Sequence, residues 1–143
     1  TLETEGRMLF AGGELGNDLA AFEDALANPA IDTIVFVNSP GGDLWTGMRV
    51  GRLIASRGLV TAVVGRCLSA CAIMSVGGRD RRFADALRTA PGFLGVHGAH
   101  NRETRQVDAQ LPFGGADLAF ERCDVHVGSP AGGWHRDGRC TGA

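Results

Sequence analysis

The chain has 143 residues, of which 44% are hydrophobic, enough for the core of one domain and too few for two. Its formal net charge of −2 gives no electrostatic footprint for nucleic acid or an anionic membrane, and no stretch approaches the roughly 20 apolar residues of a membrane span. All 14 basic side chains are Arg, so the chain contains no lysine that could serve as a base. We therefore expect no nucleic-acid partner and no membrane span.

Apolar runs and helical periodicities alternate over the first hundred residues. The almost continuously apolar run at 31–37 is typical of a strand at a central position in a parallel sheet. Glycine-rich segments at 11–16 and 38–43 are interpreted as breaks between elements. In chain order we expect a strand at 7–10, a helix from Asn17 or Asp18 to about Ala27, the strand at 31–37, a helix at 44–56 stopped by Gly58, a strand at 59–64 ended by Gly65, a short buried helix at 70–76, a polar turn at 77–82 and a strand at 93–97.

Three strand–helix alternations over roughly 75 residues predict βαβ units with right-handed crossovers. The predicted fold class is therefore α/β with a mostly parallel sheet. Beyond His100 the periodic signal fades, and the last residues are rich in Gly, Arg and His. We expect a single domain over 1–127 and a flexible tail over 128–143.

A serine lies where the strand at 59–64 gives way to the helix at 70–76, in the sequence Gly-Arg-Cys-Leu-Ser-Ala-Cys-Ala at 65–72. Backbone N–H groups at a helix start are unpaired and can stabilise a developing oxyanion. Ser69 is therefore a candidate nucleophile. The ordinary role of a serine at this position is helix capping, and taken alone that role would be favoured.

The glycine turn Pro-Gly-Gly at 40–42, Ser69 and His97 each follow a predicted strand. The carboxyl ends of parallel strands share one edge of a sheet, so we expect these residues to meet there. His97 would accept the proton of Ser69 and later pass it to the leaving amine. An N–H of Gly41 or Gly42, together with that of Ala70, would form the oxyanion hole.

These motifs together resemble the ClpP family of serine peptidases, within the larger ClpP/crotonase fold. The matching features are Asn-Ser-Pro-Gly-Gly at 38–42, Gly-x-x-x-Ser-x-x-Ala at 65–72, and His97 after a Pro-Gly turn and a short apolar strand. The resemblance covers about 7–100. It implies a spiral of ββα units, a peptidase that needs no metal or other cofactor, a peptide or protein substrate and a homo-oligomer; it leaves open whether an ATPase partner assists.

The resemblance also implies an acidic third member of the catalytic triad. Asp124 is the best candidate, because the alternating Val125 and Val127 suggest a strand there. Asp108 and Asp117 are the alternatives, and for each of the three the ordinary role is a solvated surface carboxylate. Only 46 residues follow His97, and they do not repeat the family pattern, so the domain is expected to be incomplete at its C-terminal end.

The four cysteines are an even number that fits either disulfides or free thiols. Cys67 and Cys71 flank Ser69, and their residue type favours small buried core positions over half of a metal site, since no convincing second pair follows. Flanking cysteines resemble a subgroup of secreted or periplasmic ClpP-like proteins, in which a Cys67–Cys71 disulfide would suit the compartment. The resemblance therefore favours a periplasmic or secreted location.

Two alternative functions share these motifs. A catalytically impaired or truncated ClpP-like member would keep the peptide-binding groove and act as a binding or assembly module. A crotonase-type acyl-CoA enzyme would share the oxyanion hole but would need no serine nucleophile, which the pairing of Ser69 with His97 argues against.

Overall fold

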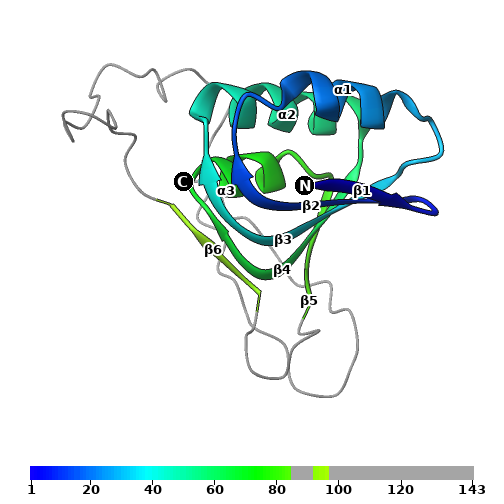
Figure 1. The fold of residues 1–143 in the computed structure, drawn as a ribbon. Coiled ribbons are helices and arrows are strands. Elements are labelled where there is room, and N and C mark those ends of the chain that lie inside the picture. The colour runs from blue at the N-terminus through cyan, green and yellow to red at the C-terminus, as the bar shows by residue number, and fades with distance from the viewer. Residues whose placement is uncertain (85–91, 97–143) are drawn as a thin grey trace, which may run out of the picture.

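The computed structural model describes residues 1–84 and 92–96 of the chain. Within these residues a six-stranded sheet curves around three helices that lie on its concave side (Figure 1). None of these helices is both long and apolar enough to cross a membrane. In chain order the elements are β1 (Leu2–Glu5), β2 (Met8–Leu15), α1 (Leu19–Ala27), β3 (Thr33–Gly42), α2 (Leu44–Arg57), β4 (Val60–Leu68), α3 (Ala70–Val76), β5 (Asp80–Ala84) and β6 (Phe93–Gly95).

The strands lie in the order β1-β2-β3-β4-β5, and β6 pairs with β4. Among the described strands β1 and β2 pair antiparallel, whereas all other pairs are parallel. Residues 60–64 of β4 pair with β5 and residues 66–68 pair with β6, so these two strands occupy successive stretches of one edge of β4. The predicted α/β class with a mostly parallel sheet is confirmed, and β3 occupies the predicted central position between β2 and β4.

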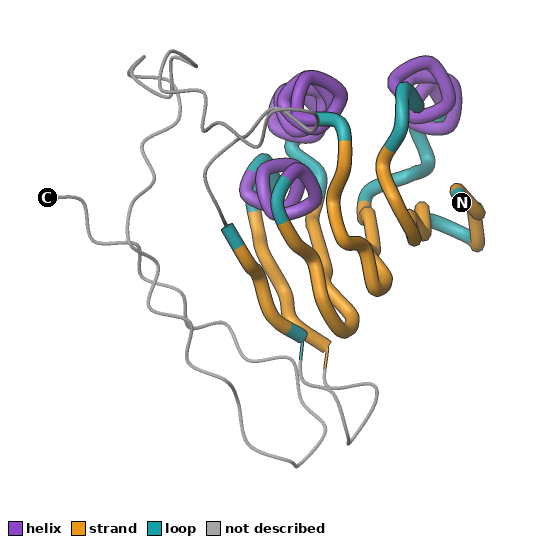
Figure 2. Tube along the Cα trace, turned by 60° about the vertical axis from the view of Figure 1, so that its left-hand side comes forward, coloured by secondary structure: helices purple, strands orange, loops and turns teal. Residues whose placement is uncertain are grey.

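Strands β2, β3 and β4 each bend at a residue with positive φ. These residues are Gly13 (φ 82°), Asn38 (φ 48°) and Gly65 (φ 70°), and we call them the bend row. The strand registers shift between Gly12 and Glu14 and on either side of Asn38, as expected where an extra residue bulges from a ladder. The registers place the three residues at the same level of neighbouring strands. The strands therefore turn together and curve around α3 (Figure 2).

The bend row explains why the predicted strand ends were wrong. The segment 11–16 does not break β2, which continues to Leu15, and the segment 38–43, also expected to be a break, lies largely within β3. Likewise β4 passes through Gly65 and ends at Leu68. A glycine in the left-handed region bends a strand as readily as it ends one. The strand β1 was not predicted, and the polar turn expected at 77–82 contains the start of β5.

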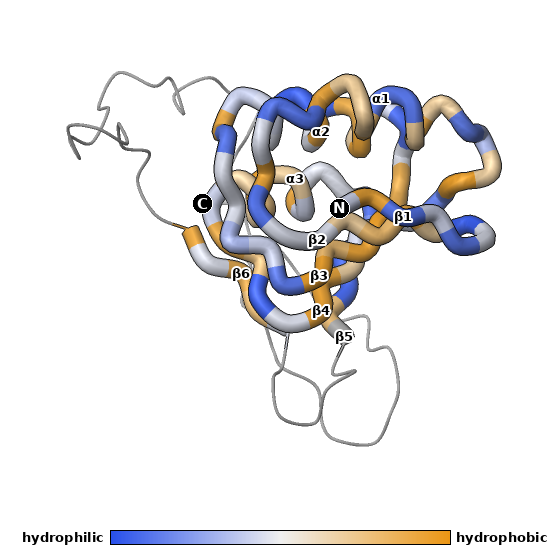
Figure 3. The backbone as a smooth tube through the Cα atoms, in the orientation of Figure 1, coloured by the Kyte–Doolittle hydropathy of each residue, from blue (hydrophilic) through white to orange (hydrophobic). Residues whose placement is uncertain are grey.

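The predicted helices are confirmed to within a few residues. The carboxylate of Asp43 accepts a hydrogen bond from the Thr46 N–H (2.7 Å) at the start of α2, and Gly58 ends that helix in the left-handed conformation (φ 60°). Apolar residues run along the first halves of β3 and β4, and hydrophilic residues lie at their bends (Figure 3). The main buried core comprises Leu9, Ala11, Leu15, Phe22, Leu26, Ile31, Ile34, Phe36, Val50, Ile54, Leu59, Val63, Cys67, Ala70, Cys71 and Met74.

Helix α3 is the buried centre of the fold, as predicted from its small apolar residues. All six residues from Ala70 to Ser75 are buried, between α2 on one side and β3 and β4 on the other. Glycines on α2 let the two helix backbones touch: a Cβ on Gly47 would lie 2.9 Å from the Ala70 Cβ, and one on Gly51 would lie 3.1 Å from the Ile73 carbonyl oxygen. The position of α3 therefore depends on the absence of a side chain at Gly47 and at Gly51 on α2.

We expect Gly47→Ala to lower the free energy of unfolding by about 1–3 kcal/mol, because the added methyl forces α2 away from α3. Helix propensity alone predicts the opposite sign, since Ala is favoured over Gly by about 1 kcal/mol. Chemical denaturation of the purified variant measures the change, with Ser56→Ala on the exposed side of α2 as a near-neutral control. A Gly47→Ala protein as stable as the wild type would contradict the close helix contact.

Candidate active site

Ser69 joins β4 to α3 in a strained backbone conformation. Its φ is 54° and its ψ is −121°, a combination that residues with a side chain rarely adopt. Such a conformation costs about 1–3 kcal/mol and persists only where surrounding contacts impose it. Two of these contacts are backbone hydrogen bonds: the Ser69 N–H donates to the Gly95 carbonyl (2.7 Å), and the Ser69 carbonyl accepts from the Ile73 N–H (3.2 Å).

The Ser69 hydroxyl is not used to cap α3. Ser69 is half-buried and occupies the N-cap position of α3, yet its side chain makes no capping hydrogen bond. The ordinary capping role that the sequence allowed is therefore not the one that the structure shows. A serine on a strained strand-to-helix turn, with its hydroxyl left over, has the local geometry of a nucleophile elbow.

Gly41 brings the end of β3 against the Ser69 turn. Its φ is 85°, and a Cβ at this position would lie 2.9 Å from the Ser69 Cβ and 3.0 Å from the Ala70 nitrogen, and would overlap the Leu68 carbonyl oxygen. Gly42 (φ 145°) instead lies against the backbone of Leu15 on β2. The structure thus brings Gly41, Ser69 and Ala70 together, as expected for the ends of neighbouring parallel strands.

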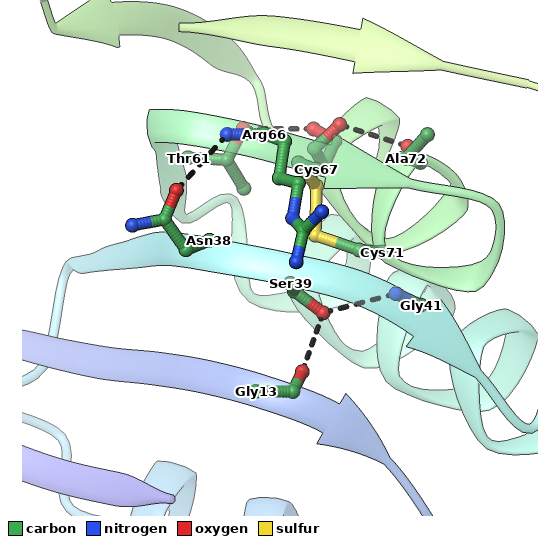
Figure 4. The surroundings of a disulfide bond; sticks show 10 residues. Gly13, Asn38, Ser39, Gly41, Thr61, Arg66, Cys67, Cys71 and Ala72 are labelled. Atoms are coloured by element: carbon green, nitrogen blue, oxygen red, sulfur yellow. Dashed lines mark hydrogen bonds between the residues drawn. A yellow bond between two sulfur atoms is a disulfide. The ribbon is translucent and has the colours of Figure 1, made fainter. Parts of the chain in front are cut away.

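Ser39 connects β2 to the glycine turn (Figure 4). This residue is buried; its hydroxyl donates to the Gly13 carbonyl (2.8 Å) and accepts from the Gly41 N–H (3.2 Å). The Gly41 N–H therefore already has a partner. We did not single out Ser39 from the sequence. The available signal was a serine two residues before a glycine, where its hydroxyl can accept a local backbone N–H.

Asn38 connects the bends of β3 and β4. Its side-chain oxygen accepts a hydrogen bond from the Arg66 N–H (3.4 Å; Figure 4) and lies where a Cβ on Gly65 would be. Asn is among the residues that tolerate a positive φ, because its side chain can bond to nearby backbone. The two strands consequently bend at the same level and reach the Ser69 turn together.

A disulfide between Cys67 and Cys71 spans the Ser69 turn (Figure 4). Their Cα atoms are 5.3 Å apart, and both residues are fully buried. The predicted burial is confirmed, and the choice between a disulfide and free thiols, which the sequence left open, is settled for this pair as a disulfide. Because both sulfurs are in the bond, they are not available as thiolate ligands for the metal half-site considered from the sequence.

A carboxylate with a shifted pKa lies away from this site. The pKa of Asp32 is lowered because the Arg7 guanidinium, at 2.6 Å, and the Thr33 hydroxyl, at 2.9 Å, both donate hydrogen bonds to its carboxylate. Asp32 directly precedes β3, whereas Ser69 lies beyond the carboxyl ends of the strands. The Arg7–Asp32 ion pair therefore lies at the amino end of β3, at the opposite end of the sheet from Ser69.

The predicted base and acid lie outside the described residues. His97 follows the last described residue, Val96, and Asp124 is further along the chain, as are the alternatives Asp108 and Asp117. The boundary expected at residue 127 and the tail at 128–143 also fall outside. Of the predicted site residues, the structure therefore places Ser69, Ala70 and the two glycines.

No protein-family model matches the chain, and no match was found among curated proteins. Among solved structures, a mutant of ClpP1 from Listeria monocytogenes matches at 21% identity and a TM-score of 0.47, over 67% of this chain and 58% of that one. A putative enoyl-CoA hydratase from Streptomyces coelicolor A3(2) matches at 13% identity and a TM-score of 0.41, over 57% of this chain and 43% of that one. The chain thus spans about half the length of these structures. At such values neither likeness assigns this chain to a family or an activity.

Proposed function

We propose that the chain is a ClpP-like serine peptidase in which Ser69 is the nucleophile. The observation that carries this proposal is the conformation of Ser69, which is held at a positive φ between a strand and a helix while its hydroxyl makes no capping bond. Strained residues of this kind are concentrated at active sites, and a strand-to-helix turn exposes a serine hydroxyl to substrate. A serine that served only as a cap would need neither feature.

His97 is the proposed general base and acid. Gly95 lies two positions before His97 in the sequence, and its carbonyl accepts a hydrogen bond from the Ser69 N–H. A described residue close in sequence to His97 therefore contacts the Ser69 turn. As the Ser69 oxygen attacks the scissile carbonyl, its proton passes to His97, which then protonates the leaving amine. Water hydrolyses the acyl-enzyme by the reverse sequence of proton transfers. Asp124 is the proposed acid that orients His97.

The N–H groups of Gly42 and Ala70 are the proposed oxyanion hole. The Gly41 N–H donates to the Ser39 hydroxyl, and the Asp43 N–H donates to the Leu15 carbonyl (2.8 Å). Both N–H groups therefore already have hydrogen-bond partners on the side of β3 that faces β2. Successive N–H groups along a strand point to alternate sides, so that of Gly42 is expected to face β4 and the Ser69 turn. Gly41 then contributes through its missing side chain, which lets β3 approach Ser69.

The proposed substrate is a peptide or protein, and the proposed assembly is a homo-oligomer; both follow from the motif resemblance. The proposed mechanism uses only side-chain and backbone groups of the chain. A periplasmic or secreted location is supported by the buried Cys67–Cys71 disulfide, because structural disulfides persist in oxidising compartments.

We expect a fluorophosphonate probe to form a single adduct on Ser69, because an activated serine attacks phosphorus as it attacks a carbonyl. Intact mass and peptide mapping of the purified protein measure the adduct. Ser69→Ala should give no adduct, and His97→Ala should lower the labelling rate by orders of magnitude, as expected for residues that act as one unit. The exposed Ser56 offers a control, and Ser56→Ala should label like the wild type. Folded wild-type protein that stays unlabelled would instead favour the binding or assembly module.

We expect Gly41→Ala to lower the rate of Ser69 labelling by about a hundredfold, the scale of losing an oxyanion-hole donor, because the methyl would displace the Ser69 turn. Gly13→Ala is the matched control: Gly13 also has a positive φ (82°), but a Cβ there would meet no atom within 4 Å. Both variants carry the left-handed backbone penalty of about 1–2 kcal/mol. Equal labelling rates in the two variants would show that contact between Gly41 and Ser69 is not required.

A further inference from the structure

We propose that the Cys67–Cys71 disulfide is a positioning device for Ser69, so that the reactivity of the serine depends on the oxidation state of this pair. The inference rests on the proposed role of Ser69 as a nucleophile and adds a means of regulation to it. Its basis is the place of the bond in the fold: the disulfide closes a small ring of backbone that contains Ser69.

The ring restricts the turn in which Ser69 lies. Cys67 is the second-last residue of β4 and Cys71 is the second residue of α3, so the bond encloses Leu68, Ser69 and Ala70. If the chain continued from Cys67 to Cys71 as an extended strand, the two Cα atoms would be about 13 Å apart. A disulfide tolerates at most about 6.8 Å, and the observed separation is 5.3 Å. The bond therefore excludes conformations in which β4 continues straight past Leu68.

Both ends of the ring are anchored in the interior. Cys67 pairs with Ser39 on β3, and Cys71 belongs to the buried core beneath α2. The enclosed Ser69 is half-buried, whereas the two cysteines are fully buried. Because Cys67 and Cys71 are held in place, the disulfide between them restricts the backbone of Ser69, the residue proposed to contact the substrate.

The remaining contacts are weak substitutes for the bond. Without it, the strained φ of 54° would rest on the hydrogen bonds to Gly95 and Ile73 and on contact with Gly41. Helix α3 has only seven residues, and so short a helix has little stability of its own. When the bond opens, we expect Ser69 to spend most of its time in ordinary conformations that misdirect its hydroxyl.

The redox step requires a dithiol as the second reactant. The dithiol delivers two electrons and two protons; the sulfur–sulfur bond breaks, Cys67 and Cys71 become thiols, and the dithiol closes to its own disulfide. Oxidation by a disulfide of the same class reverses the exchange. Since both cysteines are fully buried, the turn must open before a thiolate can attack.

The test compares oxidised protein, protein reduced with dithiothreitol, and the double variant Cys67→Ala/Cys71→Ala. Cys123 and Cys140 are replaced by Ser throughout, so that any effect belongs to this pair. One readout is the rate of fluorophosphonate labelling at Ser69, and the other is amide hydrogen exchange over 67–73, which needs no activity. We expect labelling to fall by about tenfold or more and exchange to rise in the reduced protein and the double variant, and reoxidation to restore both.

Gly58→Ala separates this role from a general loss of stability. Gly58 has φ 60° at the far end of α2, so the variant is destabilised away from the Ser69 turn and should keep its labelling rate. Equal labelling and equal exchange in oxidised and reduced protein would overturn the proposal. If the oxidised protein is not labelled at all, the peptidase proposal fails, and exchange alone decides whether the disulfide holds the turn. If the double variant does not fold, reduction of the otherwise intact protein provides the comparison.

Discussion

The structure depends on the simultaneous bending of three neighbouring strands. A flat parallel sheet would carry the ends of β3 and β4 away from the helices, whereas the bend row curves them around α3. Hydrogen bonds of two polar side chains keep the bends at the same level of the sheet. The Ser39 hydroxyl donates to the Gly13 carbonyl, and the Asn38 side chain accepts from the N–H of Arg66, just after Gly65. The geometry around Ser69 is thus a consequence of how the sheet curves, and the same hydrogen bonds serve the fold and the candidate site.

Close approach of backbones is the second theme of the fold. Gly41 admits the Ser69 turn, and Gly47 and Gly51 admit α3. At each place an added methyl group would meet a neighbour at 3.1 Å or less. Glycines are costly in a helix, so their presence on α2 reflects the contact that they permit rather than the needs of that helix.

The sequence allowed the helices, the fold class and the position of Ser69 between a strand and a helix to be predicted, because these depend on local signals. The lengths of the strands could not be predicted. A glycine such as Gly65 can end a strand or bend it, and which occurs is decided by the neighbouring strand, here by Asn38. Ser39 was missed for a similar reason, since one of its partners, Gly13, lies on a strand 26 residues away.

Burial of α3 between α2 and the sheet has a consequence for the order in which the protein folds. A seven-residue helix enclosed by β3, β4 and α2 gains its stabilising contacts only after those elements have been synthesised and have met. A nascent or partly unfolded chain should therefore carry Ser69 as an ordinary serine. The reactivity that we propose for Ser69 would then arise only together with the native fold, so the incomplete chain would not carry the proposed peptidase activity.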